Sequence, residues 1–318
     1  MAAKLADALA DRLIVPGYSK LGFLLRRGGW EDLPANALRG KRAIVTGAGS
    51  GLGKATAAGL AGLGAAVHLV VRDAAKGAVA RDEIAERVPG AELTVDVCDV
   101  SSAGSVRAFA AGFLAGHDAL DVLVHNAGVL PPERRETPDG DEITLATHVL
   151  GPFLLTGLLA GALRGSGDGR VVFVSSGGMY RAKLRDDDPQ YTVGEYRGAT
   201  AYARTKRMQV VLAGLWDREL DGVAVHSMHP GWASTPGVTD SLPRFAKLMA
   251  PLLRSAEQGA DTVVWLAAVP GGRAGGRLWH DRAPRPPHYL SSTRESRAQR
   301  ERLWAYCVER TGYSPAPF

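Results

Sequence analysis

A glycine-rich turn that directly follows an apolar stretch is the feature that most constrains this chain. The turn Thr46-Gly47-Ala48-Gly49-Ser50-Gly51-Leu52-Gly53 comes after Ala43-Ile44-Val45 and before an alanine-rich stretch of helical character. A strand that turns into a helix through glycines presents backbone N–H groups that can hold a pyrophosphate. The pattern therefore predicts a dinucleotide-binding strand, turn and helix.

The rest of the chain alternates between strand and helix patterns. Strands are predicted near 42–46, 66–71, 92–96, 121–124, 170–174, 223–228 and 276–280. Such alternation yields a doubly wound parallel sheet, a Rossmann fold of about seven strands with helices on both faces and ligands at the carboxyl ends of the strands. We expect an N-terminal helix and arm (1–39), one α/β domain (40–290) with a lid loop (177–199), and a C-terminal helix and tail (291–318).

Composition excludes several other classes of protein. The 318 residues carry a net charge of +5, but basic and acidic residues are interleaved, so nucleic acid is not expected as a partner. Two unrelated cysteines favour a reducing, cytoplasmic setting. No apolar run reaches the roughly 18 residues of a membrane span. Three consecutive carboxylates, Asp186 to Asp188, are expected to form a solvated turn, and no metal is predicted.

The N-terminal arm has a pattern of its own. Leu5, Leu9 and Leu13 repeat at helical spacing, and an apolar and basic segment from Tyr18 to Trp30 follows. A peripheral membrane contact is one interpretation of this segment. Packing on the domain or on a second subunit of a homo-oligomer is the other, and the sequence favours packing.

Two further motifs follow the glycine turn in the chain. His125-Asn126-Ala127-Gly128 ends a predicted strand, and Tyr202-Ala203-Arg204-Thr205-Lys206 lies on a predicted helix. A spacing of four residues stacks Tyr202 and Lys206 on one helix face. A phenol with a pKa near 10 is a poor base at neutral pH, and a neighbouring ammonium group together with the positive ring of a bound cofactor is expected to lower that pKa.

The glycine turn has the spacing Thr-Gly-x-x-x-Gly-x-Gly, with its glycines at Gly47, Gly51 and Gly53. Together with the two later motifs, in this order, it resembles the short-chain dehydrogenase/reductase family from about Arg42 to about Asp281. This resemblance implies a nicotinamide-dependent oxidoreductase in which Tyr202 moves the proton and Lys206 also holds the nicotinamide ribose. By family register, Ser176 polarises the substrate oxygen, and Ser175 is the alternative. The twenty-six residues between Ser176 and Tyr202 exceed the spacing of many relatives, so the lid loop is expected over the substrate site.

The same resemblance implies a set of cofactor contacts. Asp99 with Val100 matches the position that holds the adenine amino group, although Asp99 could also cap the next helix. Asn126 is expected to tie strands together, and His125 to be a packed strand-end histidine. Thr235, after Pro230-Gly231, matches the carboxamide-binding position. The predicted cofactor residues are Gly47, Ser50, Gly51, Leu52, Gly53, Arg72, Lys76, Asp99, Val100, Asn126, Ala127, Gly128, Tyr202, Lys206, Pro230, Gly231 and Thr235.

The end of the second strand indicates which cofactor is used. NAD-using relatives place a carboxylate where this chain has Val71, which cannot bond to ribose hydroxyls. The next residue, Arg72, suits a 2′-phosphate, and Lys76 adds a second positive charge nearby. NADP(H) is therefore expected, with NAD(H) as the alternative.

One catalytic position departs from the family pattern. Many relatives carry an asparagine whose backbone carbonyl binds a water that relays protons to the lysine, and His148 stands there in this chain. Because Pro152 lacks an N–H, it should free the His148 carbonyl and kink the helix. We expect that carbonyl to face a water near Lys206, with little need for the imidazole.

Three segments and the arm sharpen the resemblance to one subgroup. Ser175-Ser176-Gly177-Gly178-Met179, Ser227-Met228-His229-Pro230-Gly231-Trp232 and Gln258-Gly259-Ala260-Asp261-Thr262 are similar to the dehydrogenase/reductase SDR family member 12 group, as is Pro16-Gly17-Tyr18-Ser19-Lys20. The expected substrate is a small apolar carbonyl or alcohol. A cofactor-binding scaffold with little turnover is the alternative, suggested by His148 and the terminal extensions.

Overall fold

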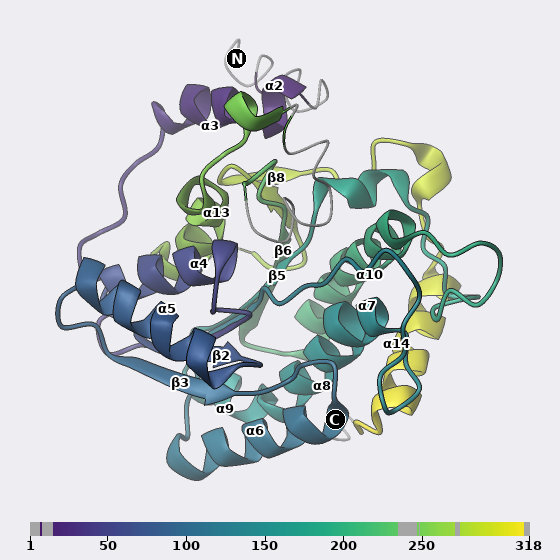
Figure 1. Ribbon diagram of the computed structural model, residues 1–318, viewed down its shortest axis with the longest axis horizontal. Coiled ribbons are helices and arrows are strands. Elements are labelled where there is room, and N and C mark those ends of the chain that lie inside the picture. The colour runs from purple at the N-terminus through teal and green to yellow at the C-terminus, as the bar shows by residue number, and fades with distance from the viewer. Residues whose placement is uncertain (1–6, 8–14, 235–246, 248, 271–273, 315–318) are drawn as a thin grey trace.

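The central sheet has eight strands in the order β3-β2-β1-β4-β5-β6-β7-β8 (Figure 1). The computed structural model describes residues 7, 15–234, 247, 249–270 and 274–314. The strands are β1 Arg42–Thr46, β2 Ala66–Val71, β3 Leu93–Val97, β4 Val122–His125, β5 Gly169–Val174, β6 Val223–Met228, β7 Leu278–His280 and β8 Ala283–Arg285. The strands from β1 to β7 pair in parallel. The predicted doubly wound α/β fold is confirmed, with each predicted strand within two residues of its expected position.

Sequence reasoning missed β8, which pairs antiparallel to β7 at the edge of the sheet. It is only three residues long and is centred on Pro284, so no alternation of apolar and polar residues reveals it. Proline is tolerated in this place because an edge strand has no neighbour on its outer side to receive its missing N–H.

Helices cover both faces of the sheet (Figure 1). One face carries α4 Gly51–Gly62, α5 Ala74–Arg87 and α13 Ala256–Ala268, whereas the other carries α6 Ala103–Gly116, α7 Ile143–Leu145, α8 Gly151–Leu158, α9 Ala160–Gly165 and α10 Gly198–Glu219. Short helical turns are η1 Ala146–Leu150, η2 Gly177–Arg181, η3 Ala250–Leu252 and η4 Ser291–Thr293.

Each face of the sheet has its own apolar core. Ile44 and Val171 point into the core beneath α6, α8 and α10, and their chain neighbours Val45 and Val172 point into the core beneath α4, α5 and α13. Successive side chains of a strand face opposite sides, so strands buried on both faces are apolar throughout. This explains why the sequence shows continuous apolar runs there.

The C-terminal helix extends the first of these cores. Helix α14 spans Arg297–Thr311, begins at a Ser296–Gln299 capping box and ends at Gly312, whose φ is +60°. Its Trp304 ring lies 4.9 Å from that of Phe153 and 4.8 Å from that of Trp216. The helix therefore lies across the outer side of α8 and α10.

Two short helices form the N-terminal arm, which we define as residues 15–30. They are α2 Val15–Tyr18 and α3 Lys20–Arg27, and they lie beyond β8 and α13 (Figure 1). The helix expected from Leu5, Leu9 and Leu13 falls outside the described residues. Among the described helices, none is both long enough and apolar enough to cross a membrane.

The strand order places a ligand site at one point of the sheet. β1 has β2 on one side and β4 on the other, so the direction of winding reverses between β1 and β4. In open α/β sheets, the crevice at this reversal, outside the carboxyl ends of the strands, is where ligands bind.

Candidate functional site

A cleft of about 650 Å³ opens at this reversal of strand order. It is lined by the predicted residues Gly47, Ser50, Gly51, Leu52, Gly53, Arg72, Lys76, Asp99, Val100, Asn126, Ala127, Gly128, Ser176, Tyr202, Lys206, Pro230 and Gly231. Thr235 lies outside the described residues. His148 is fully buried behind the cleft wall.

The glycine turn is shaped for close approach of a ligand backbone. Gly47 has a φ of +68°, which favours glycine. A Cβ at Gly53 would overlap the Gly47 carbonyl oxygen and the Asn126 amide, so only glycine fits there. Ser50 is the N-cap residue of α4, but its side chain accepts no hydrogen bond from the helix. The Ser50 hydroxyl therefore leaves the first backbone N–H groups of this twelve-residue helix available to a ligand. These features fit a pyrophosphate at the helix N-terminus.

The end of β2 carries the two basic side chains expected at the ribose. Arg72 and Lys76 both line the cleft beside Val71. The adjacent carboxylate, Asp73, accepts hydrogen bonds from the backbone N–H groups of Ala75 and Lys76 as the N-cap of α5. Because Asp73 is engaged there, the cationic groups dominate this corner of the cleft.

Asn126 ties β4 to β1, as expected. Its Nδ2 donates to the Thr46 carbonyl oxygen at 2.9 Å, and Thr46 Oγ1 accepts the backbone N–H of Asn126 at 3.0 Å. His125 packs beside it, with Nε2 at 2.7 Å from Thr156 Oγ1. Burial lowers the His125 pKa to about 3, so this imidazole is neutral.

Asp99 does not cap a helix, contrary to the alternative suggested by the sequence. Its carboxylate accepts hydrogen bonds from the backbone N–H and the hydroxyl of Ser101, and Ser102 is the N-cap of α6. Asp99 still lines the cleft, where the family resemblance expects the adenine amino group.

Helix α10 brings Tyr202 and Lys206 into the cleft together. Lys206 Nζ lies 5.4 Å from the centre of the Tyr202 ring. Ser176 lines the cleft with Tyr202, and its side chain acts on the Tyr202 pKa as a hydrogen-bond partner. Ser175 instead turns inward and donates from Oγ to the Lys206 carbonyl oxygen at 2.8 Å. Of the two serines considered from the sequence, Ser176 is therefore the one that meets the tyrosine.

Burial sets the protonation of this pair. It raises the pKa of Tyr202 above its usual value, with the Ser176 hydrogen bond opposing the rise. It also lowers the pKa of Lys206 to about 7. The expected lowering of the tyrosine pKa is therefore not found in the cofactor-free protein, because loss of solvation outweighs the influence of the neighbouring lysine.

Lys206 is held by two fixed acceptors. Its Nζ donates to the Val174 carbonyl oxygen at 2.8 Å and to Gln209 Oε1 at 3.1 Å. Gln209 is fully buried and was missed by sequence reasoning. Its place three residues after Lys206, on the same helix face, was the available signal.

The His148 carbonyl differs from expectation. The helix forms a π-turn over Ala146–Leu150, with the Gly151 N–H bonded to the Ala146 carbonyl oxygen. The freed His148 carbonyl accepts Gln209 Nε2 at 2.9 Å. A buried amide is therefore one partner of this carbonyl, and a water beside it stays a prediction.

The His148 imidazole has a defined structural task. The Val129 N–H donates to its Nε2 at 3.0 Å, so the ring proton lies on Nδ1, 2.8 Å from Thr205 Oγ1. Burial, together with Lys206, holds the His148 pKa well below its usual value. The neutral ring therefore links the end of β4 to α10, a structural contact that the sequence did not indicate, and a mild effect of removing the imidazole stays a prediction.

The long segment before Tyr202 does not lie over the cleft as a lid. Of residues 177–199, only Gly178 and Ala199 line the cleft. Asp186 pairs with Arg302, and Gln190 bonds to Asp141 and Tyr306, which fastens the segment to α14 and the loop before α7. These long-range polar contacts pull the segment away from the site, which corrects the predicted position.

The carboxylates of the acidic run in that segment are bonded to other groups of the chain. Asp187 pairs with Arg185, and Asp188 accepts from the backbone N–H and hydroxyl of Thr192. Within the part of the chain that the structure describes, no group of three or more histidine, cysteine, aspartate or glutamate side chains could hold a metal ion.

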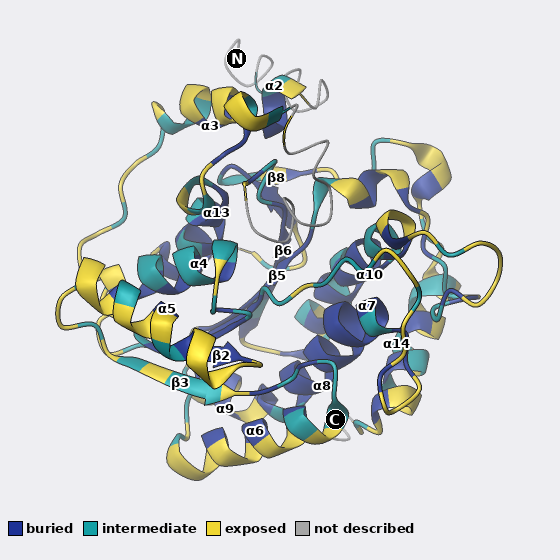
Figure 2. Cartoon of the chain, in the orientation of Figure 1, coloured by how far each residue is buried: buried dark blue, intermediate teal, exposed yellow. Residues whose placement is uncertain are grey.

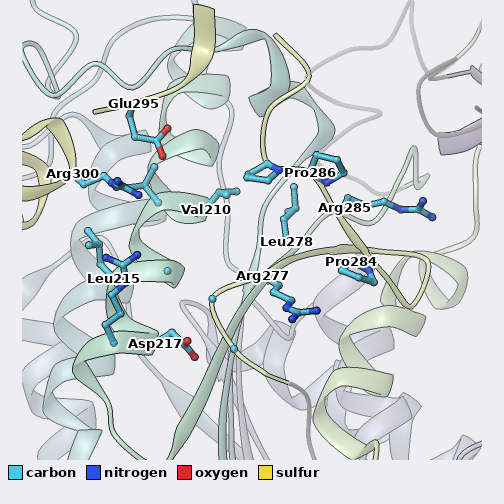
Figure 3. A pocket seen from close by; sticks show the side chains of 16 residues that line it. Val210, Leu215, Asp217, Arg277, Leu278, Pro284, Arg285, Pro286, Glu295 and Arg300 are labelled. Carbon is cyan, nitrogen blue, oxygen red and sulfur yellow. The ribbon is translucent and has the colours of Figure 1, made fainter. Parts of the chain in front are cut away.

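A second cavity of about 690 Å³ lies between the C-terminal half of α10 and the β7–β8 hairpin (Figure 3). Val210, Leu278 and Pro286 form apolar walls, and Asp217 and Arg277 lie at one end. It contains neither the glycine turn nor the tyrosine and lysine. The first cleft is therefore the candidate active site.

Comparisons with known proteins agree with this site. A family model described as "short chain dehydrogenase" matches residues 41–244. The chain is 42% identical over 267 residues to "Dehydrogenase/reductase SDR family member 12" of Bos taurus, covering 83% of this chain and 84% of that protein. It is 36% identical over 286 residues to "Retinol dehydrogenase 12" of Bos taurus, covering 86% and 87%.

A solved structure provides a further comparison. A protein from Beutenbergia cavernae, provisionally described as an NAD(P) dependent gluconate 5-dehydrogenase and holding NADP at low occupancy, is 25% identical to this chain. The match has a TM-score of 0.62 and covers 78% of this chain and 97% of the other.

Proposed function

Because the chain belongs to the short-chain dehydrogenase/reductase family of oxidoreductases, we propose that it is an NADP(H)-dependent enzyme interconverting a carbonyl and an alcohol on an apolar substrate. One observation carries the proposal. Ser176, Tyr202 and Lys206 meet in the cleft that also holds the glycine turn. A reacting carbon placed beside Tyr202 would share the cleft with a dinucleotide bound at α4.

Arg72 and Lys76 support the choice of NADP(H). The adenosine 2′-phosphate carries negative charge and matches a guanidinium by paired hydrogen bonds. Val71 offers no acceptor to the ribose hydroxyls of NAD(H), and Asp73 is engaged as a helix cap. The bound NADP of the Beutenbergia cavernae protein is consistent with this choice.

The chain's own groups divide the acid–base work. When bound, the nicotinamide cofactor exchanges a hydride with the substrate carbon. For carbonyl reduction, the raised pKa keeps Tyr202 protonated, so the phenol can donate its proton to the developing alkoxide oxygen. Ser176 donates a hydrogen bond to the same oxygen, and the Lys206 ammonium stabilises the resulting phenolate.

The wall of the cleft around Tyr202 supports an apolar substrate. Val129, Leu130 and Trp232 line it, with the small residues Ala199 and Ala203 on the α10 side. Such lining excludes water from the reacting carbonyl and offers few polar partners to a sugar. The similarity to a retinol dehydrogenase points to the same class of substrate.

We further propose a reducing, cytoplasmic location. Cys98 and Cys307 are both buried and free. Burial raises the pKa of the Cys307 thiol, and the Cys98 pKa is also raised, so neither is an activated nucleophile.

A turnover assay separates this proposal from a cofactor-binding scaffold. NADPH consumption is followed with aldehydes, ketones and quinones that carry apolar chains, and with sugar aldehydes as a polar control. The proposal expects turnover with an apolar carbonyl, loss of it in Ser176→Ala, and weak activity on sugars. NADPH binding without turnover across the whole panel would favour the scaffold.

A further inference from the structure

Exposed apolar side chains gather on the N-terminal arm. Val15, Leu21, Leu24 and Leu25 are 47%, 53%, 52% and 71% exposed, and they are four of the nine exposed large apolar residues among those described. Leu21, Leu24 and Leu25 stand at positions i, i+3 and i+4 of α3, so they share one helix face. Figure 2 shows this helix as largely exposed at the edge of the molecule. Gathered exposed apolar groups mark an interaction surface.

The opposite face of the arm is fixed by buried charge. Arg254 is 1% exposed and donates to the Gly17 and Ser19 carbonyl oxygens as well as to Asp281. Arg26 also donates to the Gly17 carbonyl oxygen and pairs with Asp281. Removing one member of such a buried network is costly. The arm is therefore held in one place, with its leucines outward.

The arm touches the substrate end of the cleft. The Trp232 N–H donates to the Tyr18 carbonyl oxygen at 2.8 Å, and Trp232 lines the cleft. The Tyr18 ring also abuts Gly177, next to Ser176, where a Cβ would lie 2.6 Å from the ring. A surface that binds the leucines would consequently lie beside the route by which substrate reaches Tyr202.

The charge of the arm and the length of α3 indicate what kind of partner the exposed leucines bind. Residues 1–30 contain five basic residues and two acidic ones. Of the basic residues on α3, Arg26 has a side chain that is 9% exposed and pairs with Asp281, whereas Arg27 is half-exposed and pairs with Asp32. Lys20 is exposed beside the leucines. A helix of eight residues is about 12 Å long, too short to supply the roughly 800 Å² per partner of a stable protein interface. A few leucines flanked by basic residues suffice for reversible binding at an anionic lipid surface.

We propose that the leucine face of α3 docks this protein on the surface of an anionic lipid bilayer and holds the cleft beside it. Apolar substrate then passes between bilayer and cleft without crossing water. Transfer of substrate from the bilayer rests on the proposed function, but docking itself needs neither cofactor nor substrate.

Sedimentation with vesicles tests docking. The full chain is mixed with phosphatidylcholine vesicles containing about three parts in ten phosphatidylglycerol, and with phosphatidylcholine alone. Leu21→Ser/Leu24→Ser/Leu25→Ser should lower partitioning at least about tenfold, because each leucine loses apolar burial. The matched control, Val79→Ser/Leu114→Ser/Leu290→Ser, removes three large apolar groups elsewhere that are 58%, 40% and 55% exposed, and it should leave partitioning unchanged.

Leu25→Cys labelled with an environment-sensitive dye gives a second measurement without removing three leucines. Its emission should shift to the blue on anionic vesicles, whereas a label at Val79→Cys should not respond. Equal sedimentation of the native chain with and without vesicles overturns the proposal. A native dimer that the leucine variant converts to a monomer also overturns it and identifies a second copy as the occupant.

Discussion

The side-chain amide of Gln209 donates a hydrogen bond to the backbone carbonyl oxygen of His148 across 2.9 Å. Its other end accepts from Lys206 Nζ at 3.1 Å. One buried side chain thus joins the π-turn before α8 to the lysine beside the reacting tyrosine. Gln209 is best described as a positioning residue, because it touches Lys206 and lines no part of the cleft.

Gln209 variants should move the pH profile in opposite directions. Gln209→Leu removes an acceptor from the ammonium, so the Lys206 pKa falls and the activity optimum moves to lower pH. Turnover should drop about tenfold or more, the scale of a hydrogen bond to a charged group. Gln209→Glu adds a carboxylate, which raises the Lys206 pKa and moves the optimum upward. Identical profiles for both variants would contradict the positioning role.

Arg72→Ala should erase most of the preference for NADPH over NADH. A charge-assisted contact to phosphate contributes about 1.5–3 kcal/mol, so NADPH affinity should fall about tenfold to a hundredfold while NADH affinity stays constant. Titration of each cofactor by fluorescence measures both affinities. Arg81→Ala, an exposed arginine of α5 paired with Asp82, serves as the control. Equal binding of the two cofactors by the native protein would refute the assignment.

Tyr202→Phe should lower the chemical rate at least about a hundredfold, the scale of lost general acid–base catalysis, while NADPH still binds. Single-turnover kinetics with an active substrate measure this rate. Tyr196→Phe is the matched control, because the Tyr196 hydroxyl donates to Glu142 and lies outside the cleft lining. Retained activity in Tyr202→Phe would transfer the acid role to another group.

Local motifs made much of this fold and site predictable. The spacing of Gly47, Gly51 and Gly53 and the four-residue step from Tyr202 to Lys206 are read within one turn or one helix. Both kinds of motif encode geometry that the surrounding few residues impose. For the same reason, apolar runs located the strands.

Contacts between segments that are distant in the sequence could not be predicted from local patterns. Gln209 and His148 are 61 residues apart, and Trp232 and Tyr18 are more than two hundred apart, so no local pattern couples them. The lid expectation failed for a similar reason. A polar run such as Arg185–Asp188 does not reveal that partners on α14 will hold it away from the cleft.

Gly53→Ala should disrupt both the fold near the turn and cofactor binding. The added methyl would overlap the Gly47 carbonyl oxygen and the Asn126 amide, which are backbone and a fixed side chain with little room to move. We expect a loss of about 1–3 kcal/mol in unfolding free energy, as for other overpacked sites. Gly112→Ala, in the middle of α6 with open space around it, should instead stabilise by about 0.5–1 kcal/mol through helix propensity. Chemical denaturation compares the two, and equal effects would contradict the cradle geometry.

Burial of Lys206 should also make the free energy of unfolding depend on pH. Its pKa is about 7 in the folded, cofactor-free protein, against about 10.4 when unfolded. Between these values the unfolded chain binds a proton that the folded chain has released, so the free energy of unfolding rises with pH. Below about pH 7 both states are protonated, and the cost of burying the ammonium is at its greatest.

Lys206→Met keeps a side chain of similar length without the charge. Its stability relative to the native protein should therefore be most favourable at and below about pH 7 and should decline as pH rises. Each pH unit in that range changes the difference by about 1.4 kcal/mol, so between about pH 7 and about pH 9 the gap should change by on the order of 2–3 kcal/mol. Urea unfolding of both cofactor-free proteins measures it. A gap that stays constant with pH would mean that the folded pKa is near 10 and that Lys206 is solvated, contrary to its buried position.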